Sequence, residues 1–255
     1  MAHPGNLQEQ IAFFAKNDYC FFPNVLSREE CDTINAAVDR NRRDCPGLWG
    51  SGARAQSSHC ILGMPECDYL IRHPAFFPLA RAIVSDVVFS EFGFMFREGG
   101  QQPELPSWHQ DCGINEKNPY DVTALSAIFY LTDVDQTSAR YTLIPGSHKV
   151  AERPNPVTPD SVDVEGEVEM IGEAGSCIFV NAGIWHAGKV GTGPRERRTA
   201  HIYLQPESIP QFSPHNVYPR RLWDVPDPEQ RRFFSHFNAL TRAVASEYAP
   251  PDSRV

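Results

Sequence analysis

The chain alternates between two hydrophobic patterns, one typical of amphipathic helices and the other typical of buried strands. Apolar residues recur every three or four positions in four segments, and this spacing predicts helices at residues 7–16, 27–41, 73–84 and from 227 onward. Short apolar runs bounded by turn residues predict strands at residues 19–22, 87–96, 124–131, 141–144, 168–171, 177–180 and 197–204. Many short strands, preceded by helices and closed by one, indicate a β-sandwich or barrel.

Two of the predicted helices carry clear start signals. Ser27 and Glu30 form a capping box, and Asp227 followed by Pro228 supplies an N-cap residue and a proline at the first helical position. The last helix carries an apolar stripe, which we expect to pack against a sheet, with a dimer contact as the alternative; it consists of Phe233, Phe237, Leu240, Val244 and Tyr248.

Three stretches lack periodicity. Residues 45–60 contain three glycines and Trp49, and this loop could either close over a substrate or serve as a plain surface connection. Residues 153–159 are rich in proline and cannot be a central strand, and residues 206–219 are again rich in proline. No linker divides the chain, so we expect one domain, 1–255, with a helical part to about 85, a β core from about 86 to 205 and a C-terminal loop and helix at 206–255.

Composition excludes several classes of partner. Hydrophobic residues make up 41% and charged residues 22% of the 255, which argues against disorder. The net charge is −9, and no run of Lys or Arg resembles a nucleic-acid footprint. Seven cysteines without metal-binding spacing, no signal peptide in Met1–Glu9 and no long apolar span predict a soluble cytoplasmic protein with reduced thiols, no membrane partner, and a monomeric or homodimeric state.

The candidate chemistry begins at His109 and Asp111. In a strand, side chains two residues apart point to the same side, so this imidazole and this carboxylate share one space. His186, 75 residues after Asp111, supplies a second imidazole. Two neutral nitrogens and one anionic oxygen on one face of a metal leave the other positions open, which suits non-haem Fe(II) and oxygen chemistry. The alternatives are two separately buried histidines and, for the ligand set, the neighbouring Cys112, which is disfavoured because iron oxygenases avoid oxidisable thiolates.

At several segments the chain resembles a known family. The segments are Trp108-His109-Gln110-Asp111, Leu143 to Lys149, Gly175 to Asn181, and His186 with Arg197 eleven residues later. In this order, across roughly residues 5 to 205, they resemble the phytanoyl-CoA dioxygenase-like (PhyH) branch of the Fe(II)/2-oxoglutarate-dependent oxygenases. The resemblance implies a double-stranded β-helix, the cupin-like jelly roll, whose mouth holds Fe(II) on His109, Asp111 and His186, with 2-oxoglutarate and O2 as cosubstrates.

The resemblance also implies that Arg197 binds the distal carboxylate of 2-oxoglutarate, with Thr199 as a hydroxyl partner. The planar guanidinium of arginine suits two-point binding of a carboxylate. Strand alternation sends Arg198 to the opposite face, among apolar neighbours, and Arg195 lies nearer a turn, so a solvated role suits both better.

Related halogenases have Gly or Ala where this chain has Asp111, so hydroxylation or another oxidation of a C–H bond is expected. Most of the predicted substrate pocket is aromatic, which suits a small metabolite with an apolar skeleton and one polar or anionic group, although these aromatics could instead fill the barrel. The predicted pocket consists of Trp49, His59, Phe94, Phe96, Tyr130, Arg140 and Trp185.

Two other functions compete with an oxygenase acting on a small molecule in biosynthesis. One is a cupin-like protein that binds a metal or ligand without turnover. The other is a zinc hydrolase or metal-dependent isomerase with the same ligands. Both leave Arg197 without a purpose, whereas an oxygenase needs it for its cosubstrate.

Overall fold

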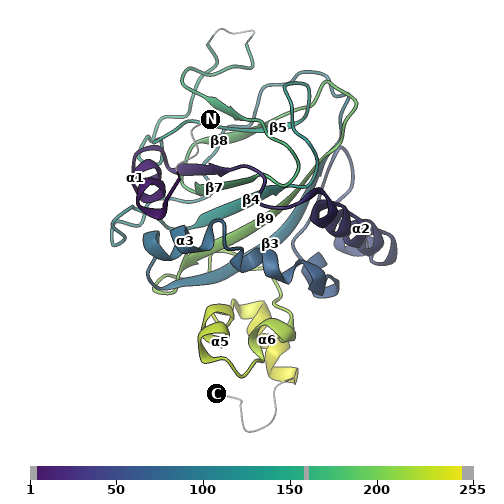
Figure 1. Ribbon diagram of the computed structural model, residues 1–255, viewed down its shortest axis with the longest axis vertical. Coiled ribbons are helices and arrows are strands. Elements are labelled where there is room, and N and C mark those ends of the chain that lie inside the picture. The colour runs from purple at the N-terminus through teal and green to yellow at the C-terminus, as the bar shows by residue number, and fades with distance from the viewer. Residues whose placement is uncertain (1–4, 158–160, 249–255) are drawn as a thin grey trace.

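Two antiparallel sheets form the centre of the computed structural model, which describes residues 5–157 and 161–248 (Figure 1). The larger sheet has six strands in the order β1-β7-β4-β9-β3-β2, and the smaller has three in the order β6-β5-β8. The strands are β1 Tyr19–Phe22, β2 Arg54–Ser57, β3 Val87–Arg97, β4 Leu125–Tyr130, β5 Arg140–Leu143, β6 Val168–Met170, β7 Cys177–Asn181, β8 His186–Lys189 and β9 Arg197–Pro206. This arrangement is the predicted jelly roll.

Helices cover the outer face of the larger sheet. The first three, α1, α2 and α3, lie over its strands, whereas α5 and α6 lie at one end near the C-terminus (Figure 1). The capping box at Ser27 and Glu30 is confirmed, and Asn6 with Glu9 forms another. The helices are α1 Leu7–Asn17, α2 Arg28–Asp44, α3 Phe77–Ile83, α4 Arg220–Trp223, α5 Pro228–Phe234 and α6 Ala239–Tyr248.

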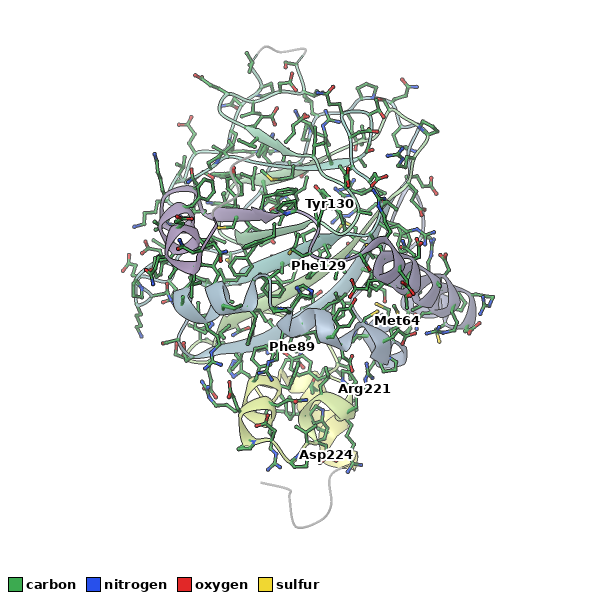
Figure 2. The ribbon with its side chains drawn as sticks, viewed as in Figure 1. Met64, Phe89, Phe129, Tyr130, Arg221 and Asp224 are labelled. Carbon is green, nitrogen blue, oxygen red and sulfur yellow. The ribbon has the colours of Figure 1, made fainter. Side chains whose placement is uncertain are left out.

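Strand alternation divides the core into two layers. Phe129 and Tyr130 are consecutive on β4 and both fully buried, yet they point to opposite faces (Figure 2). Phe129 packs under the helices, with its ring centroid 5.9 Å from that of Phe76. Tyr130 lies between the sheets and donates its hydroxyl proton to the carbonyl of Met170 at 2.6 Å. The larger sheet is therefore buried on both sides.

The predicted loop at 45–60 is wrong in part, because it contains β2. This strand pairs with β3 at the edge of the larger sheet, with Arg54 opposite Arg97. Only Ala55 and Ser57 of its four residues are buried, so it has no apolar run to predict it. The segments after it, Cys60–Gly63 and Pro65–Arg72, are 3-10 helices.

Two predicted helices have different bounds in the structure. The helix predicted at 73–84 begins only at Phe77. The last predicted helix is divided into α5 and α6, although Asp227 caps α5 as expected by accepting from the backbone N–H of Glu229 at 2.9 Å.

The C-terminal apolar stripe packs partly as predicted. Phe233 is buried against Phe77, with ring centroids 5.4 Å apart, and Phe237 packs against Trp223, whereas Leu240 is exposed. The side chain of Tyr248 lies outside the described residues. Figure 2 shows Arg221 beside these helices, where it bonds to both carboxylate oxygens of Asp68, at 2.7 and 2.8 Å.

The predictions for the N-terminus and for the proline-rich loop fall partly on residues outside those that the structure describes. Residues 1–4 of the N-terminus and residues 158–160 of the proline-rich loop lie outside the described residues, as do 249–255. Among the helices in the described ranges, none is both long enough and apolar enough to cross a bilayer.

Candidate metal and cofactor site

The backbone brings the two histidines together. His109 and His186 form an isolated antiparallel bridge, in which each backbone N–H donates to the carbonyl of the other at 3.0 Å. The backbone N–H of Asp111 donates to the carbonyl of Ala182 at 2.9 Å, which holds Asp111 beside the segment that leads from β7 to β8. These three residues are thus positioned by main-chain pairing between segments far apart in the sequence.

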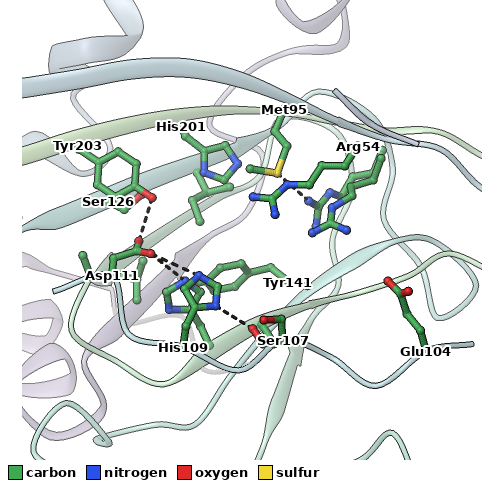
Figure 3. Close-up of a pocket in the computed structure, with 18 of the residues that line it drawn as sticks. Arg54, Met95, Glu104, Ser107, His109, Asp111, Ser126, Tyr141, His201 and Tyr203 are labelled. Atoms are coloured by element: carbon green, nitrogen blue, oxygen red, sulfur yellow. Dashed lines mark hydrogen bonds and ion pairs between the residues drawn. The ribbon is translucent and has the colours of Figure 1, made fainter. Parts of the chain in front are cut away.

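Their side chains converge on one point, and Figure 3 shows those of His109 and Asp111 facing each other. Oδ1 of Asp111 lies 3.4 Å from Nε2 of His109 and 3.6 Å from Nε2 of His186, and one ligand atom from each residue lies within 4.8 Å of the others. Nδ1 of His109 lies 2.8 Å from the carbonyl of Ser107, and Nδ1 of His186 lies 3.0 Å from that of Ile184. These hydrogen bonds hold a proton on Nδ1 and leave Nε2 free for a metal, so the donor set fits Fe(II).

The electrostatics of Asp111 and His186 favour metal binding, whereas the hydrogen bond with Asp111 raises the pKa of His109. Burial lowers the pKa of His186, which keeps its imidazole neutral. Burial alone would raise the pKa of Asp111, but the hydrogen bond with His109 and the nearby His186 lower it overall, so the carboxylate is ionised. The hydroxyl of Tyr203 donates to Oδ2 of Asp111 at 3.0 Å, which orients the carboxylate and leaves Oδ1 facing the histidines.

A cavity of about 420 Å³ opens beside these residues, between the two sheets. His109, Asp111 and His186 form part of its wall, and His201 and Tyr203 extend that wall along β9. Apolar side chains of the two sheets complete it, among them Ile128, Val180 and Ala187. This volume is enough for a small cosubstrate and part of a substrate.

Arg197 lines this cavity from β9. Its side chain is 3% exposed, its Nε has no hydrogen-bond partner among the described residues, and its Nη2 lies 3.7 Å from the sulfur of Met95. A buried guanidinium whose Nε has no acceptor and whose Nη2 donates to a thioether sulfur is poorly satisfied, so this one is available to an anion in the cavity.

The neighbouring arginines face elsewhere. Arg198 lies on the opposite side of β9, where it pairs with Asp39 at 2.8 Å and stacks over the ring of Phe96. Arg195 is half exposed, 3.5 Å from Asp135. The predicted strand register is therefore confirmed. Thr199 shares the side of Arg197 but does not line the cavity, and its hydroxyl lies 2.9 Å from Nε2 of His201.

None of the seven residues of the predicted substrate pocket lines the cavity that holds His109, Asp111 and His186. Phe94 and Phe96 belong to the helix-side core, since on β3 it is Met95 and Arg97 that face the cavity. Trp49 packs against Phe96 at 5.4 Å between ring centroids. Phe94 does line a smaller adjoining hollow.

The other four residues of that prediction are held by their own partners. Tyr130 lies in the core between the sheets, where its hydroxyl bonds to a backbone carbonyl. Arg140 pairs with Glu169 at 2.7 Å. The indole N–H of Trp185 donates to the carbonyl of Val150 at 2.6 Å, and Nε2 of His59 lies 2.8 Å from the carbonyl of His215 in an outer hollow.

Several cavity residues were not predicted. His201 and Tyr203 continue the alternation that begins at Arg197, so the same strand pattern could have identified them. Tyr141 stacks on His186 with ring centroids 5.2 Å apart. Arg54 and Arg97 carry no local signal, because the first lies in a strand without an apolar pattern and the second at the end of an apolar strand.

Comparison with solved structures supports the fold. HygX from Streptomyces hygroscopicus, solved with nickel, 2-oxoglutarate and hygromycin B bound, superposes with a TM-score of 0.64 at 13% identity, covering 80% of this chain and 89% of that one. The non-heme alpha ketoglutarate dependent carbocyclase SnoK from nogalamycin biosynthesis superposes with a TM-score of 0.62 at 22% identity, covering 81% and 88%.

Sequence comparison identifies the family. An ectoine dioxygenase of Bordetella bronchiseptica is 24% identical over 233 residues, which span 77% of this chain and 73% of that protein. The model of the phytanoyl-CoA dioxygenase (PhyH) family matches residues 14–199. The prediction of an Fe(II)- and 2-oxoglutarate-dependent dioxygenase is confirmed, and the chain belongs to the phytanoyl-CoA dioxygenase family.

Proposed function

We propose that His109, Asp111 and His186 hold Fe(II), that Arg197 binds the distal carboxylate of 2-oxoglutarate, and that the protein oxidises a C–H bond of a small molecule. The observation that carries this assignment is that a buried guanidinium without a carboxylate partner among the described residues faces the same cavity as the three convergent ligands. A cosubstrate with one end on the metal and a carboxylate at the other end would satisfy both.

When bound, Fe(II) with 2-oxoglutarate and O2 supplies the oxidising power to remove hydrogen from a C–H bond, while 2-oxoglutarate becomes succinate and CO2. The part of the protein is to bind, orient and exclude water. The carbonyls of Ser107 and Ile184 fix the two imidazoles, and Tyr203 fixes the carboxylate.

Thr199 acts indirectly in this proposal. Its hydroxyl bonds to His201, whose imidazole lines the cavity. Burial lowers the pKa of His201 to about 3, so the ring stays neutral beside Arg197 and does not add a positive charge to the cosubstrate site.

A small-molecule substrate is supported by the relatives, whose names refer to ectoine, nogalamycin and hygromycin B. Hydroxylation is the simplest outcome for a site that keeps Asp111 as a ligand. A single domain over 1–255, a cytoplasmic location and a monomeric or homodimeric state stay predictions. The alternative of a cupin-like protein without turnover is not favoured, because the family is one of dioxygenases.

The test is spectroscopic and catalytic. Under nitrogen, Fe(II) and 2-oxoglutarate added to the protein should produce the visible absorption band of the cosubstrate chelated to iron. With O2, succinate should form, and a panel of metabolites should identify the substrate by faster release. Arg197→Ala should lose the band at 2-oxoglutarate concentrations that suffice for Arg198→Ala. Failure of the wild-type protein to bind 2-oxoglutarate in the presence of Fe(II) would refute the proposal.

A further inference from the structure

Three arginines stand in one row across the larger sheet. Arg54 on β2 is directly opposite Arg97 on β3, and Arg97 is directly opposite Arg197 on β9. All three side chains line the cavity of the metal site, where Figure 3 shows that of Arg54 beside Met95. Like charges directly opposite each other destabilise a sheet, so this row requires compensation.

The described residues do not supply enough negative charge. None of the three arginines forms an ion pair with a carboxylate in residues 5–157 or 161–248, and Nε of Arg97, like that of Arg197, is buried without a hydrogen-bond partner. Burial and the charges of Arg197 and Arg54 lower the pKa of Arg97 to about 10, and Glu104 at the cavity wall acts in the opposite direction. The row therefore keeps a net positive charge.

A second buried cation shows how this fold neutralises charge where no ligand is needed. The ammonium of Lys189 on β8 lies 2.7 Å from Asp163, 2.5 Å from Glu167 and 2.9 Å from Glu169. Three carboxylates thus surround one lysine, whereas Glu98 and Glu104, which line a hollow together with Arg54 and Arg97, form no ion pair with these arginines among the described residues. The contrast indicates that the arginines are left free for ligands that come from solution.

The proposed function, on which this inference rests, accounts for one of the three. The charges of Fe(II) and Arg197 balance those of 2-oxoglutarate and Asp111, so the loaded site leaves Arg54 and Arg97 without an anion. We propose that Arg54 and Arg97 form a subsite for an anionic group of the substrate, a carboxylate or a phosphate. Guanidinium groups bind both by paired N–H donors.

The positions of the two arginines suit a substrate that enters from the mouth. Arg54 is exposed and also lines two hollows that adjoin the cavity, and Arg97 is partly buried and lines one of them. On β8, opposite them, a Cβ at Gly188 would lie 3.0 Å from Nη2 of Arg97, so the glycine leaves room for this guanidinium. An anion held here leaves the rest of the molecule to extend toward His109 and Asp111.

The experiment uses protein loaded with Ni(II), which does not turn over, and with saturating 2-oxoglutarate. Binding of benzoate, phenyl phosphate and benzyl alcohol is measured by calorimetry for the wild-type protein, Arg54→Gln and Arg97→Gln. Arg81→Gln is the control, because Arg81 pairs with Glu229 on α5, away from the cavity. Benzoate or phenyl phosphate should bind the wild type and the control with similar affinity. The same anion should bind Arg54→Gln and Arg97→Gln at least about tenfold more weakly. Benzyl alcohol, which has no charge, should bind the wild type and all three variants with the same affinity. The anion that binds the wild type more tightly shows whether the subsite prefers a carboxylate or a phosphate.

Three results would overturn the inference. The anions could bind the variants as well as the wild type, or fail to bind a wild type that does bind 2-oxoglutarate. Alternatively, Arg97→Gln could weaken 2-oxoglutarate binding as much as Arg197→Ala does, which would assign the row to the cosubstrate. A wild type that binds no 2-oxoglutarate refutes the proposed function itself. Arg97→Lys, which keeps the charge, replaces Arg97→Gln if that variant does not fold.

Discussion

The two faces of the larger sheet are built for opposite purposes. On the helix side, residues such as Phe89, Phe129 and Phe179 are fully buried in one continuous apolar layer. On the side of the smaller sheet, the same strands present Arg197, His201 and Tyr203 to a cavity. Adjacent residues of one strand thus contribute to stability and to chemistry in alternation.

This difference shows how a jelly roll tolerates a costly site. Buried unpaired guanidinium groups and a hollow of about 420 Å³ both disfavour folding. The helix-side layer offsets that cost because its apolar side chains are closely packed and buried. Substitutions on the two faces should therefore separate activity from stability.

The largest expected effect is on the cavity face. Asp111→Ala removes the carboxylate of the proposed iron site and should abolish succinate formation while leaving the folded state intact. The measurement pairs succinate release with thermal unfolding of the apo-protein. Succinate formation at the wild-type rate would show that the ligand set is wrong.

A substitution on the helix face should have the opposite signature. Phe129→Ala removes a fully buried ring that contacts His73 and Phe76, and it should lower the free energy of unfolding by about 3–5 kcal/mol. Denaturant unfolding measures this loss. Ser126→Ala is the matched control, since Ser126 lies on the cavity side of the same strand, and it should cost less than about 1 kcal/mol. Equal losses would contradict the separation of the two faces.

Arg197 and Arg198 are adjacent on β9 but lie on opposite faces of the larger sheet, so they test the difference between the two faces. Arg197→Ala should weaken 2-oxoglutarate binding by roughly 2–5 kcal/mol, because a buried charged pair is lost. Arg198→Ala removes a partly exposed ion pair with Asp39 and should change stability by less than about 1 kcal/mol and 2-oxoglutarate binding hardly at all. Calorimetry with Ni(II) in place of Fe(II) gives both affinities, and the reverse order would mean that the cosubstrate lies elsewhere.

The sequence predicted best what depends on local spacing. The alternation along β9 and the capping box at Ser27 each act over a few residues, and each reappears in the structure. His109 and Asp111 also share one side, but the strand expected there is wrong, because His109 forms only an isolated bridge. The cavity wall depends instead on which strands become neighbours. Arg54 faces Arg97 only because β2 pairs with β3, and nothing in the residues around Arg54 predicts that pairing.

The predicted pocket residues lie outside the main cavity for the same reason. Aromatic residues were expected to face the metal because they are large and apolar, but the same property places Phe96 and Trp49 under the helices. On β3 it is the odd-numbered Met95 and Arg97 that reach the cavity. Which residues of a strand face the core is fixed by its more hydrophobic face, and on β3 the more hydrophobic face is turned away from the site.

The smallest expected effect concerns Tyr203, whose hydroxyl donates to Asp111 at 3.0 Å. Tyr203→Phe keeps the ring, which stacks on Phe212, and removes the hydroxyl that bonds to Asp111 and to Ser126. Loss of such a bond to a ligand should weaken metal binding by roughly 10–100-fold. The control is Tyr218→Phe on the helix face, where the hydroxyl bonds to the carbonyls of Phe89 and Ser90, so that this substitution should lower stability and leave metal affinity unchanged. Competition with a chelator for Fe(II) or Mn(II), measured alongside thermal unfolding, compares the two. If Tyr203→Phe loses stability but keeps its metal affinity, the tyrosine belongs to the packing of the sheet rather than to the site, and the division between the two faces is less strict than their residues indicate.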